Sequence, residues 1–478
     1  MWRVMWRQGP SLIGSIHSLA VPYLDAILAS RKHLWADLSP AGDAEPIFLG
    51  HPAAQRLSVL SLPDLTDEAK AAMDLAGFFH VFVASEAEAR KLVGRLRADP
   101  DVNYAEMQAR LHPAVRFSET RQTDTITLGL SVPPRPTPDL TAKQAYLGPA
   151  PVGIDALYAW TRRGGRGAGV QVVDVENGWN FNHEDLKENA KGVVFGGSSY
   201  DFDHGTAVLG IFSADQNAFG VTGIASDALL MTAAPDWGGT KWNAAGAIKF
   251  AADRLKKGDV ILLEMHAPGP NSHHLDDPES QQGFVAVEYW LPEFQAIQFA
   301  VAKGINVVEA AGNGGENYDD ASYQSLFSRA VRDSGAILVG AGQPSRAPQP
   351  RSRIDWSNCG SRLDVQGWGL DIVTTGGKQN QPVDTRYYDL IDSPDSSRCY
   401  TQSFGGTSGA SPMVVGAVAC ISGAVAAAGR APLTPSAMRQ LLVETGTPQT
   451  DAPGFPVASD NIGPLPNLRA ALSRLALV

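Results

Sequence analysis

Gly169-Val170-Gln171-Val172-Val173 is a short apolar run that ends directly at the carboxylate of Asp174. Two later segments, 241–257 and 285–303, are long enough to be crossover helices. This alternation predicts an α/β fold, with a parallel sheet covered by helices on both faces. The other apolar runs of strand length are 228–233, 259–263, 305–309 and 336–339.

The chain upstream of this region is organised differently. Residues 1–52 show no pattern that assigns them a role, whereas residues 53–110 alternate short strands with helices. We therefore expect a small α+β module at 53–110, a proline-rich linker at 111–140 and the large domain at 141–478. The elements predicted in the module are 56–62, 64–73, 78–84, 85–99 and 102–108.

The composition is that of a globular protein, since 44% of the 478 residues are apolar and 19% are charged. A formal charge of −11 opposes binding to nucleic acid or anionic membranes, because both need a basic surface.

No segment has the ~18 uninterrupted apolar residues of a membrane span. The segment after Arg3 and Arg7 lacks a convincing signal cleavage site. We expect a soluble protein, with an intracellular location favoured.

Three cysteines are too few and too scattered for a disulfide scaffold or a zinc site with paired short spacings. Cys420 lies in an apolar run and is expected to be a small buried hydrophobic residue. Cys359 and Cys399 are left as one candidate pair for a disulfide.

Four polar residues stand where α/β proteins place reactive groups, at the ends of strands and the starts of helices. Asp174 could accept the Nδ1–H of an imidazole, and His204 begins an apolar helix after Asp203. Ser408 begins a long helix of small residues, where backbone N–H groups favour a developing negative charge. Asn313 follows a strand and could donate its amide to the same oxyanion. Each residue alone would suggest a turn or a structural side chain; together they predict acyl transfer.

The segments around these four residues resemble the Asp, His, Asn and Ser blocks of the subtilisin-like serine proteases, across most of residues 140–478. One block departs from the family pattern, because the usual Asp-Thr/Ser-Gly is here Asp174-Val175-Glu176-Asn177-Gly178. The resemblance implies a serine endopeptidase that needs no cofactor for catalysis and acts on protein or peptide substrates. In it Ser408 is the nucleophile, His204 the general base, Asp174 the orienting carboxylate, and Asn313 with the Ser408 N–H the oxyanion hole.

The N-terminal module resembles the ferredoxin-like inhibitory prodomains of these enzymes, most closely across residues 96–106. This implies a zymogen that cuts itself within the linker and whose module acts as an intramolecular inhibitor. The alternative is a small domain that stays permanently attached.

The resemblance also implies a calcium site and a first side-chain pocket. The calcium ligands would be the side chains of Asp185 and Asn217 and the carbonyls of Asp215, Phe219 and Val221. The pocket would be flanked by Glu264, Met265 and His266 on one side and by Ala310 and Gly312 on the other. Glu264 would then favour Lys or Arg before the cut; alternatively, it is hydrogen-bonded within the site and modulates His204.

Two functions of other classes stay open. One is a catalytically silent protein that uses the protease fold for binding. The other is a carboxyl-type serine protease, which would use a Glu and an Asp with the serine and should lack His204. Glu264 keeps that second alternative open.

Overall fold

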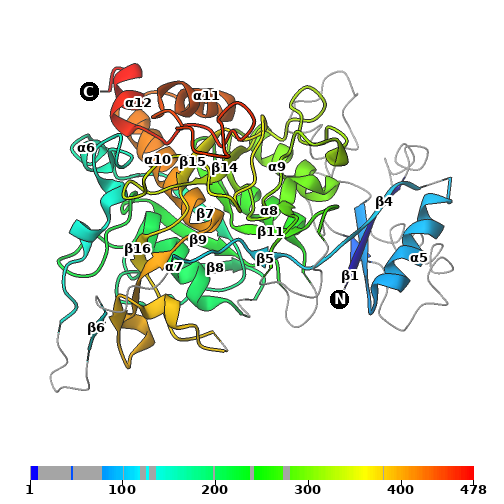
Figure 1. Ribbon diagram of the computed structural model, residues 1–478, viewed down its shortest axis with the longest axis horizontal. Coiled ribbons are helices and arrows are strands. Elements are labelled where there is room, and N and C mark those ends of the chain that lie inside the picture. Colours follow the sequence, from blue (N-terminus) through cyan, green and yellow to red (C-terminus); the bar gives the residue numbers. More distant parts are fainter. Residues whose placement is uncertain are drawn as a thin grey trace.

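The computed structural model describes residues 2–8, 45–46, 78–100, 102–118, 125–128, 136–197, 200–236, 242–272, 280–380 and 382–477. A small N-terminal module lies at one end of the molecule, and a larger domain built on a central sheet forms the rest (Figure 1).

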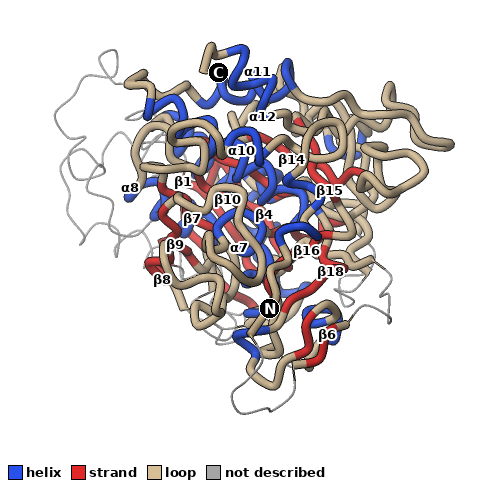
Figure 2. Tube along the Cα trace, turned by 90° about the vertical axis from the view of Figure 1, so that its left-hand side faces the viewer, coloured by secondary structure: helices blue, strands red, loops and turns tan. Residues whose placement is uncertain are grey.

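The central sheet of the large domain has seven parallel strands. Figure 2 shows these strands crossing the domain from β8 to β15. The five strands predicted from the sequence are all present, which confirms the α/β prediction, and β8 and β15 are additional. In sheet order they are β15 (Val365–Trp368), β14 (Ile337–Gly342), β13 (Asn306–Ala310), β10 (Val260–Leu263), β7 (Gln171–Val175), β9 (Leu229–Ala233) and β8 (Ala190–Phe195).

Helices cover both faces of this sheet because neighbouring strand residues point to opposite sides. Val172 packs in a buried cluster with α7 and α10, whereas Val173 packs in a second cluster with α8 and α9. The helices of the domain are α6 (Ala156–Ala159), α7 (Phe202–Ser213), α8 (Ala244–Arg254), α9 (Leu291–Ala302), α10 (Thr407–Ala427), α11 (Pro435–Thr445) and α12 (Leu468–Arg474). Short 3₁₀ turns lie at Thr141–Lys143, Ala145–Leu147, Val287–Tyr289, Ala321–Tyr323, Thr385–Tyr388 and Ser396–Arg398.

Helix α10 is long and apolar enough to cross a membrane. Its residues Thr407–Val425 are buried within the domain, and α10 contacts β13, β14 and β15 of the sheet. We therefore interpret α10 as the central core helix of the domain.

In its described residues, the N-terminal module is a four-stranded antiparallel sheet packed with helix α5 (Glu86–Arg97). Its strands, in sheet order, are β2 (Glu45–Pro46), β3 (Phe78–Val83), β1 (Trp2–Gln8) and β4 (Val102–Gln108). The predicted β3, α5 and β4 are confirmed, and Ser85 and Glu88 form the predicted capping box. The predicted boundary at residue 53 is wrong, because β1 pairs with both β3 and β4. The elements predicted at 56–62 and 64–73 lie outside the described residues.

Parts of the predicted linker belong to two small sheets of the large domain. β5 (His112–Pro113) joins β11 (Met265–Pro268) and β12 (Phe284–Ala286). β6 (Ile126–Thr127) joins β17 (Ile391–Asp392), β18 (Tyr400–Phe404) and β16 (Ile372–Thr375). At β5 and β6 the predicted linker is therefore paired with strands of the large domain.

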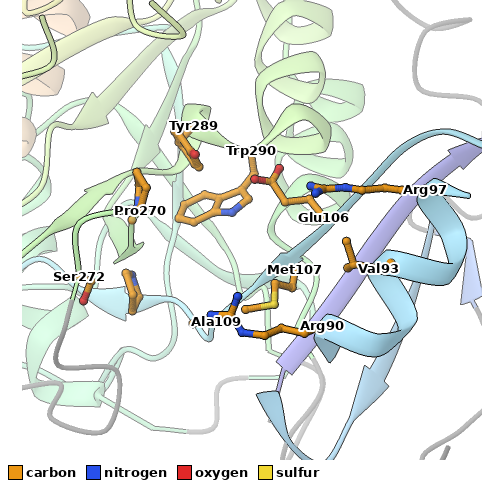
Figure 3. Close-up of a pocket in the computed structure, with 13 residues that line it drawn as sticks. Arg90, Val93, Arg97, Glu106, Met107, Ala109, Pro270, Ser272, Tyr289 and Trp290 are labelled. Atoms are coloured by element: carbon orange, nitrogen blue, oxygen red, sulfur yellow. The ribbon is translucent and has the colours of Figure 1, made fainter. Parts of the chain in front are cut away.

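The module docks on the large domain through β1 and β3. Arg3 is fully buried and its guanidinium forms an ion pair with Glu293 of α9, which is also fully buried. Phe82 packs edge-on against Trp242, with ring centroids 5.1 Å apart. Beside this contact, a cavity of about 490 Å³ separates α5 and β4 from the loop that carries Pro270 and from Trp290 (Figure 3). The docking contact therefore involves β1 and β3, together with Tyr104 of β4, which packs against the same buried cluster.

Candidate active site

The side chains of the candidate site meet at the carboxyl edge of the central sheet. β7, β10 and β13 are neighbours in the sheet, and the chain leaves them toward Glu176, Glu264 and Asn313 respectively. Helix α7 carries His204 and helix α10 carries Ser408. The crevice outside the carboxyl ends of parallel strands is where α/β proteins place their sites.

His204 is held by Glu176. Its Nδ1 lies 2.6 Å from Oε1 of Glu176, and only 1% of each side chain is exposed. The Nε2 of His204 has no hydrogen-bond partner within the described part of the chain, so this nitrogen is free to accept a proton during catalysis. Burial lowers the pKa of His204 to about 4. The imidazole is therefore neutral at pH 7, the state that a general base requires.

Asp174, the predicted partner of His204, has a different neighbour. Its Oδ2 accepts a hydrogen bond from the indole N–H of Trp179 at 2.7 Å. Burial raises the pKa of Asp174, and the charge of Glu176 raises it further. The prediction that Asp174 contacts the imidazole is thus wrong in this structure. Asp174 is still inside β7, whereas Glu176 lies two residues further on, beyond the end of the strand.

A signal for Glu176 was present in the sequence. Glu176-Asn177-Gly178 has the same order of an acidic residue, a polar residue and a glycine as the family's Asp-Thr/Ser-Gly. Because side chains alternate along a strand, positions 174 and 176 point to the same side, and the outer one extends further toward the edge. A glutamate at the outer position therefore competes with Asp174 for the imidazole.

Glu264 is held inside the domain by Ser411. The Ser411 hydroxyl donates to Oε1 of Glu264 at 2.5 Å and also lies 2.7 Å from the Thr407 carbonyl. Burial, together with the charge of Asp174, raises the pKa of Glu264 well above its usual range. Glu264 is therefore a buried carboxyl group that is hydrogen-bonded within the site.

Residues 112–118 cross the candidate site in an extended conformation. Strand β5 pairs antiparallel with β11, with Pro113 opposite Met265. Further along, the N–H of Ser118 donates to the Ser403 carbonyl at 2.8 Å. Figure 1 shows this part of the chain running from the module past β5 along the large domain.

The carbonyl of Ala114 is bound at the start of α10. It accepts the backbone N–H of Ser408 at 3.1 Å, and the next carbonyl, of Val115, accepts the side-chain amide of Gln281 at 3.2 Å. Gly406 has φ of 87°, and a side chain on it would lie 2.1 Å from the Ala114 oxygen. A glycine there lets the strand approach Ser408 closely.

Asn313 lies beside Ser408 but its amide is already engaged. Its Oδ1 accepts from the backbone N–H and the hydroxyl of Thr407, both at 2.9 Å. Its Nδ2 donates to Oε1 of Gln281 at 2.9 Å. Sequence reasoning did not find Gln281, and no motif surrounds it that could have indicated it. In this state Gln281 links the predicted oxyanion residue to Val115.

Comparison with known proteins agrees with this geometry. The sequence model of the subtilase family, peptidase family S8, matches residues 165–462, which is more than half of the chain. The chain belongs to the subtilase family.

Several curated relatives of this subtilase are serine proteases. Subtilisin DY of Bacillus licheniformis is 28% identical over 57% of this chain and 84% of its own length. An intracellular serine protease of Paenibacillus polymyxa is 26% identical over 63% of the chain and 82% of its own. Thermitase of Thermoactinomyces vulgaris is 31% identical over 47% and 71%. The chain is accordingly a serine-type endopeptidase.

A solved structure shows the same fold. The keratinolytic enzyme fervidolysin of Fervidobacterium pennivorans superposes with a TM-score of 0.58 at 18% identity. The superposition covers 98% of this chain but 60% of fervidolysin, so this chain spans a little over half the length of that structure.

Subtilases need no cofactor for catalysis and commonly bind calcium, but the two side-chain ligands predicted here do not fit the ion. Oδ1 of Asp185 accepts from the amide nitrogen of Asn217, and its Oδ2 accepts from Tyr400 and the N–H of Val221. The N–H of Phe219 donates to Oδ1 of Asn217, which fixes that amide with its NH₂ toward Asp185. An amide nitrogen does not bind Ca²⁺.

We expect EGTA to leave the melting temperature of this subtilase unchanged, because hydrogen bonds already engage the Asp185 and Asn217 side chains, the two predicted side-chain ligands. Thermal unfolding with EGTA, with excess Ca²⁺ and with excess Mg²⁺ measures this. A lower melting temperature in EGTA that only Ca²⁺ restores would show that the loop rearranges around the ion.

The predicted pocket residues occupy different surroundings. The Glu264 carboxyl faces Ser411 and lies near Asp174 inside the domain, in accord with the alternative of an internally bonded carboxyl. Met265 packs in the core, and Ala310 ends β13 in a buried position.

His266 and Gly312, by contrast, do lie together. The Nδ1 of His266 accepts the backbone N–H of Asn313 at 3.2 Å.

The cysteines form no disulfide. Cys359, Cys399 and Cys420 are all free and buried, so the candidate pair between the first two is not formed. The pKa of each thiol is raised by burial, which keeps the thiols protonated and unreactive at pH 7.

Proposed function

We propose that this subtilase hydrolyses peptide bonds with Ser408 as nucleophile, His204 as general base and Glu176 as the carboxylate that orients the imidazole. The observation that carries the assignment is the 2.6 Å contact between Nδ1 of His204 and Glu176. An orienting group must hold Nδ1 so that Nε2 points toward the nucleophile. Asp174, bonded to Trp179, supports the loop that follows β7 instead.

The reaction proceeds through an acyl-enzyme. Ser408 Oγ attacks the carbonyl carbon while its proton passes to Nε2 of His204, and the Ser408 N–H binds the oxyanion. His204 then protonates the leaving amine as the C–N bond breaks. Water attacks the resulting ester, giving one proton to His204, and the acyl group leaves as a carboxylic acid while Ser408 regains its proton. Asn313 would complete the oxyanion hole once its amide leaves Gln281.

We propose further that the chain is made as a zymogen and that it cuts itself between Ala114 and Val115. Two contacts support this bond: the Ala114 carbonyl accepts the Ser408 N–H, as an oxyanion would, and Gln281 holds the Val115 carbonyl on the other side. The antiparallel pairing of β5 with β11 presents the chain as a substrate strand.

The N-terminal module would inhibit the enzyme after this cut. Fragment 1–114 ends in the strand that occupies the cleft, and its Arg3 is buried in an ion pair with Glu293 of the large domain. Removing one partner of a buried ion pair is strongly destabilising, so the fragment should leave slowly.

Mass spectrometry of the purified chain tests the self-cleavage. We expect wild type to separate under denaturing conditions into residues 1–114 and a fragment that begins at Val115, because this peptide bond lies at Ser408. Ser408→Ala should stay intact.

A peptide that spans residues 111–118, added to processed wild type, controls for access, since it should be cut at the same bond. A fully active wild type of intact mass would show that the module is a fixed domain. Covalent labelling of Ser408 by a fluorophosphonate separates both outcomes from a catalytically silent binding protein.

A further inference from the structure

The residue before the proposed cut, Ala114, lies in a fully enclosed position. It is 0% exposed, although it directly follows β5, a strand paired with β11 of the large domain. Its carbonyl is bound by Ser408, and Gly406 lies against the same oxygen. A larger side chain at this position would need a space beside the strand to enter.

The register of β5 on β11 shows which residue borders that space. Pro113 is opposite Met265, and His112 is opposite His266. Continuing the alternation of β5 by one residue places Ala114 on the same face as His112, and His266 shares that face. Ala114 and His266 are therefore diagonal neighbours, within reach of each other's side chains.

The ring of His266 fills this side of β11. Its Nδ1 accepts the N–H of Asn313 at 3.2 Å, and a Cβ on Gly312 would lie 3.4 Å from the same nitrogen. Its ring packs edge-on against Phe284, with centroids 4.8 Å apart. The imidazole is 0% exposed and thus lies wedged between β11, β12 and the loop that follows β13.

We propose that the His266 ring fills the space that would take the side chain of the residue preceding the scissile bond. This subtilase therefore cleaves after small residues such as alanine and glycine. The proposal rests on the proposed function, with Ala114–Val115 as the bond presented to Ser408. His266 is a specificity-determining residue. A large aromatic or a long basic side chain at this position would overlap the imidazole, whose hydrogen bond to Asn313 and packing on Phe284 hold it in place.

The full chain offers a direct test through its own cleavage. Wild type and Ala114→Gly should both be cut, whereas Ala114→Phe should stay intact because phenylalanine meets the ring of His266. The double variant Ala114→Phe/His266→Gly should be cut again, since glycine removes the ring. Ala114→Phe cut as fast as wild type, or a folded double variant that stays intact, would overturn the proposal.

Peptides added in trans give the same comparison without the constraint of the linker. The series Leu-His-Pro-X-Val-Arg-Phe-Ser, with X as Ala, Gly, Phe or Lys, follows residues 111–118. For the processed wild type we expect kcat/KM for Ala to exceed that for Phe by about 100-fold, and the ratio to fall below about tenfold in His266→Gly.

Each enzyme serves as its own reference, so a loss of folding that lowers both rates leaves the ratio unchanged. His266→Asn is the matched control, because it keeps a hydrogen-bond acceptor near the Asn313 N–H while removing part of the ring, and its ratio should be intermediate. Fluorophosphonate labelling of Ser408 keeps the two proposals separate. A chain that neither takes the label nor cuts any peptide contradicts the proposed function, whereas a labelled wild type that prefers Phe or Lys contradicts only the role of His266.

Discussion

Ser408→Ala is expected to lower the rate of self-cleavage by about 10⁶-fold, the loss that follows removal of the nucleophilic serine in the related enzyme subtilisin. Without the hydroxyl, no acyl-enzyme forms, and His204 has no proton to accept. The fold should survive, because alanine removes a single oxygen and is the best helix former at this position in α10. The measurement is the rate of appearance of residues 1–114 over time, with melting temperature as the check on folding.

Asn313→Ala provides a graded comparison. It leaves the nucleophile and base intact and removes one oxyanion donor, so the loss should be smaller, roughly 10²–10³-fold, again by analogy with subtilisin.

For the first prediction, self-cleavage of Ser408→Ala within about tenfold of wild type would contradict the assignment of Ser408 as the nucleophile.

Glu176→Gln is expected to lower the rate by about 10⁴-fold, the size of loss that follows removal of the orienting carboxylate in other serine proteases. A glutamine amide can present its NH₂ group to Nδ1, which then selects the wrong tautomer of His204. Asp174→Asn should cost far less, because asparagine still offers an oxygen to the indole N–H of Trp179. The two amide variants are matched, since each replaces one carboxyl oxygen by nitrogen.

The pH–rate profile distinguishes an orienting role from a structural one. A carboxylate on Nδ1 stabilises the imidazolium, so removing it lowers the pKa of His204 and moves the acid limb of the profile to lower pH. We expect this displacement in Glu176→Gln and not in Asp174→Asn. If Asp174→Asn is the more damaging change and also moves the acid limb, Asp174 is the third member of the triad.

Local pattern was sufficient to predict five of the seven strands of the central sheet. Val172 and Val173 belong to a run that is apolar on both sides, and such runs form strands only where both faces are covered by helices. The capping box of Ser85 and Glu88 is likewise a relation between residues three apart. Strand β1 could not be predicted in this way, because its partners β3 and β4 lie at least 70 residues further along the chain.

The sequence by itself determined the family and the identity of Ser408 and His204, because each lies in a segment whose few neighbouring residues define its place at the start of a helix. Only the tertiary structure decided which carboxyl group touches His204, since Asp174 lies inside β7 and Glu176 lies just beyond its end. The same holds for Ala114 at Ser408 and for His266 beside it. These contacts join residues more than 100 positions apart, and they depend on the register of β5 against β11, which no local pattern contains.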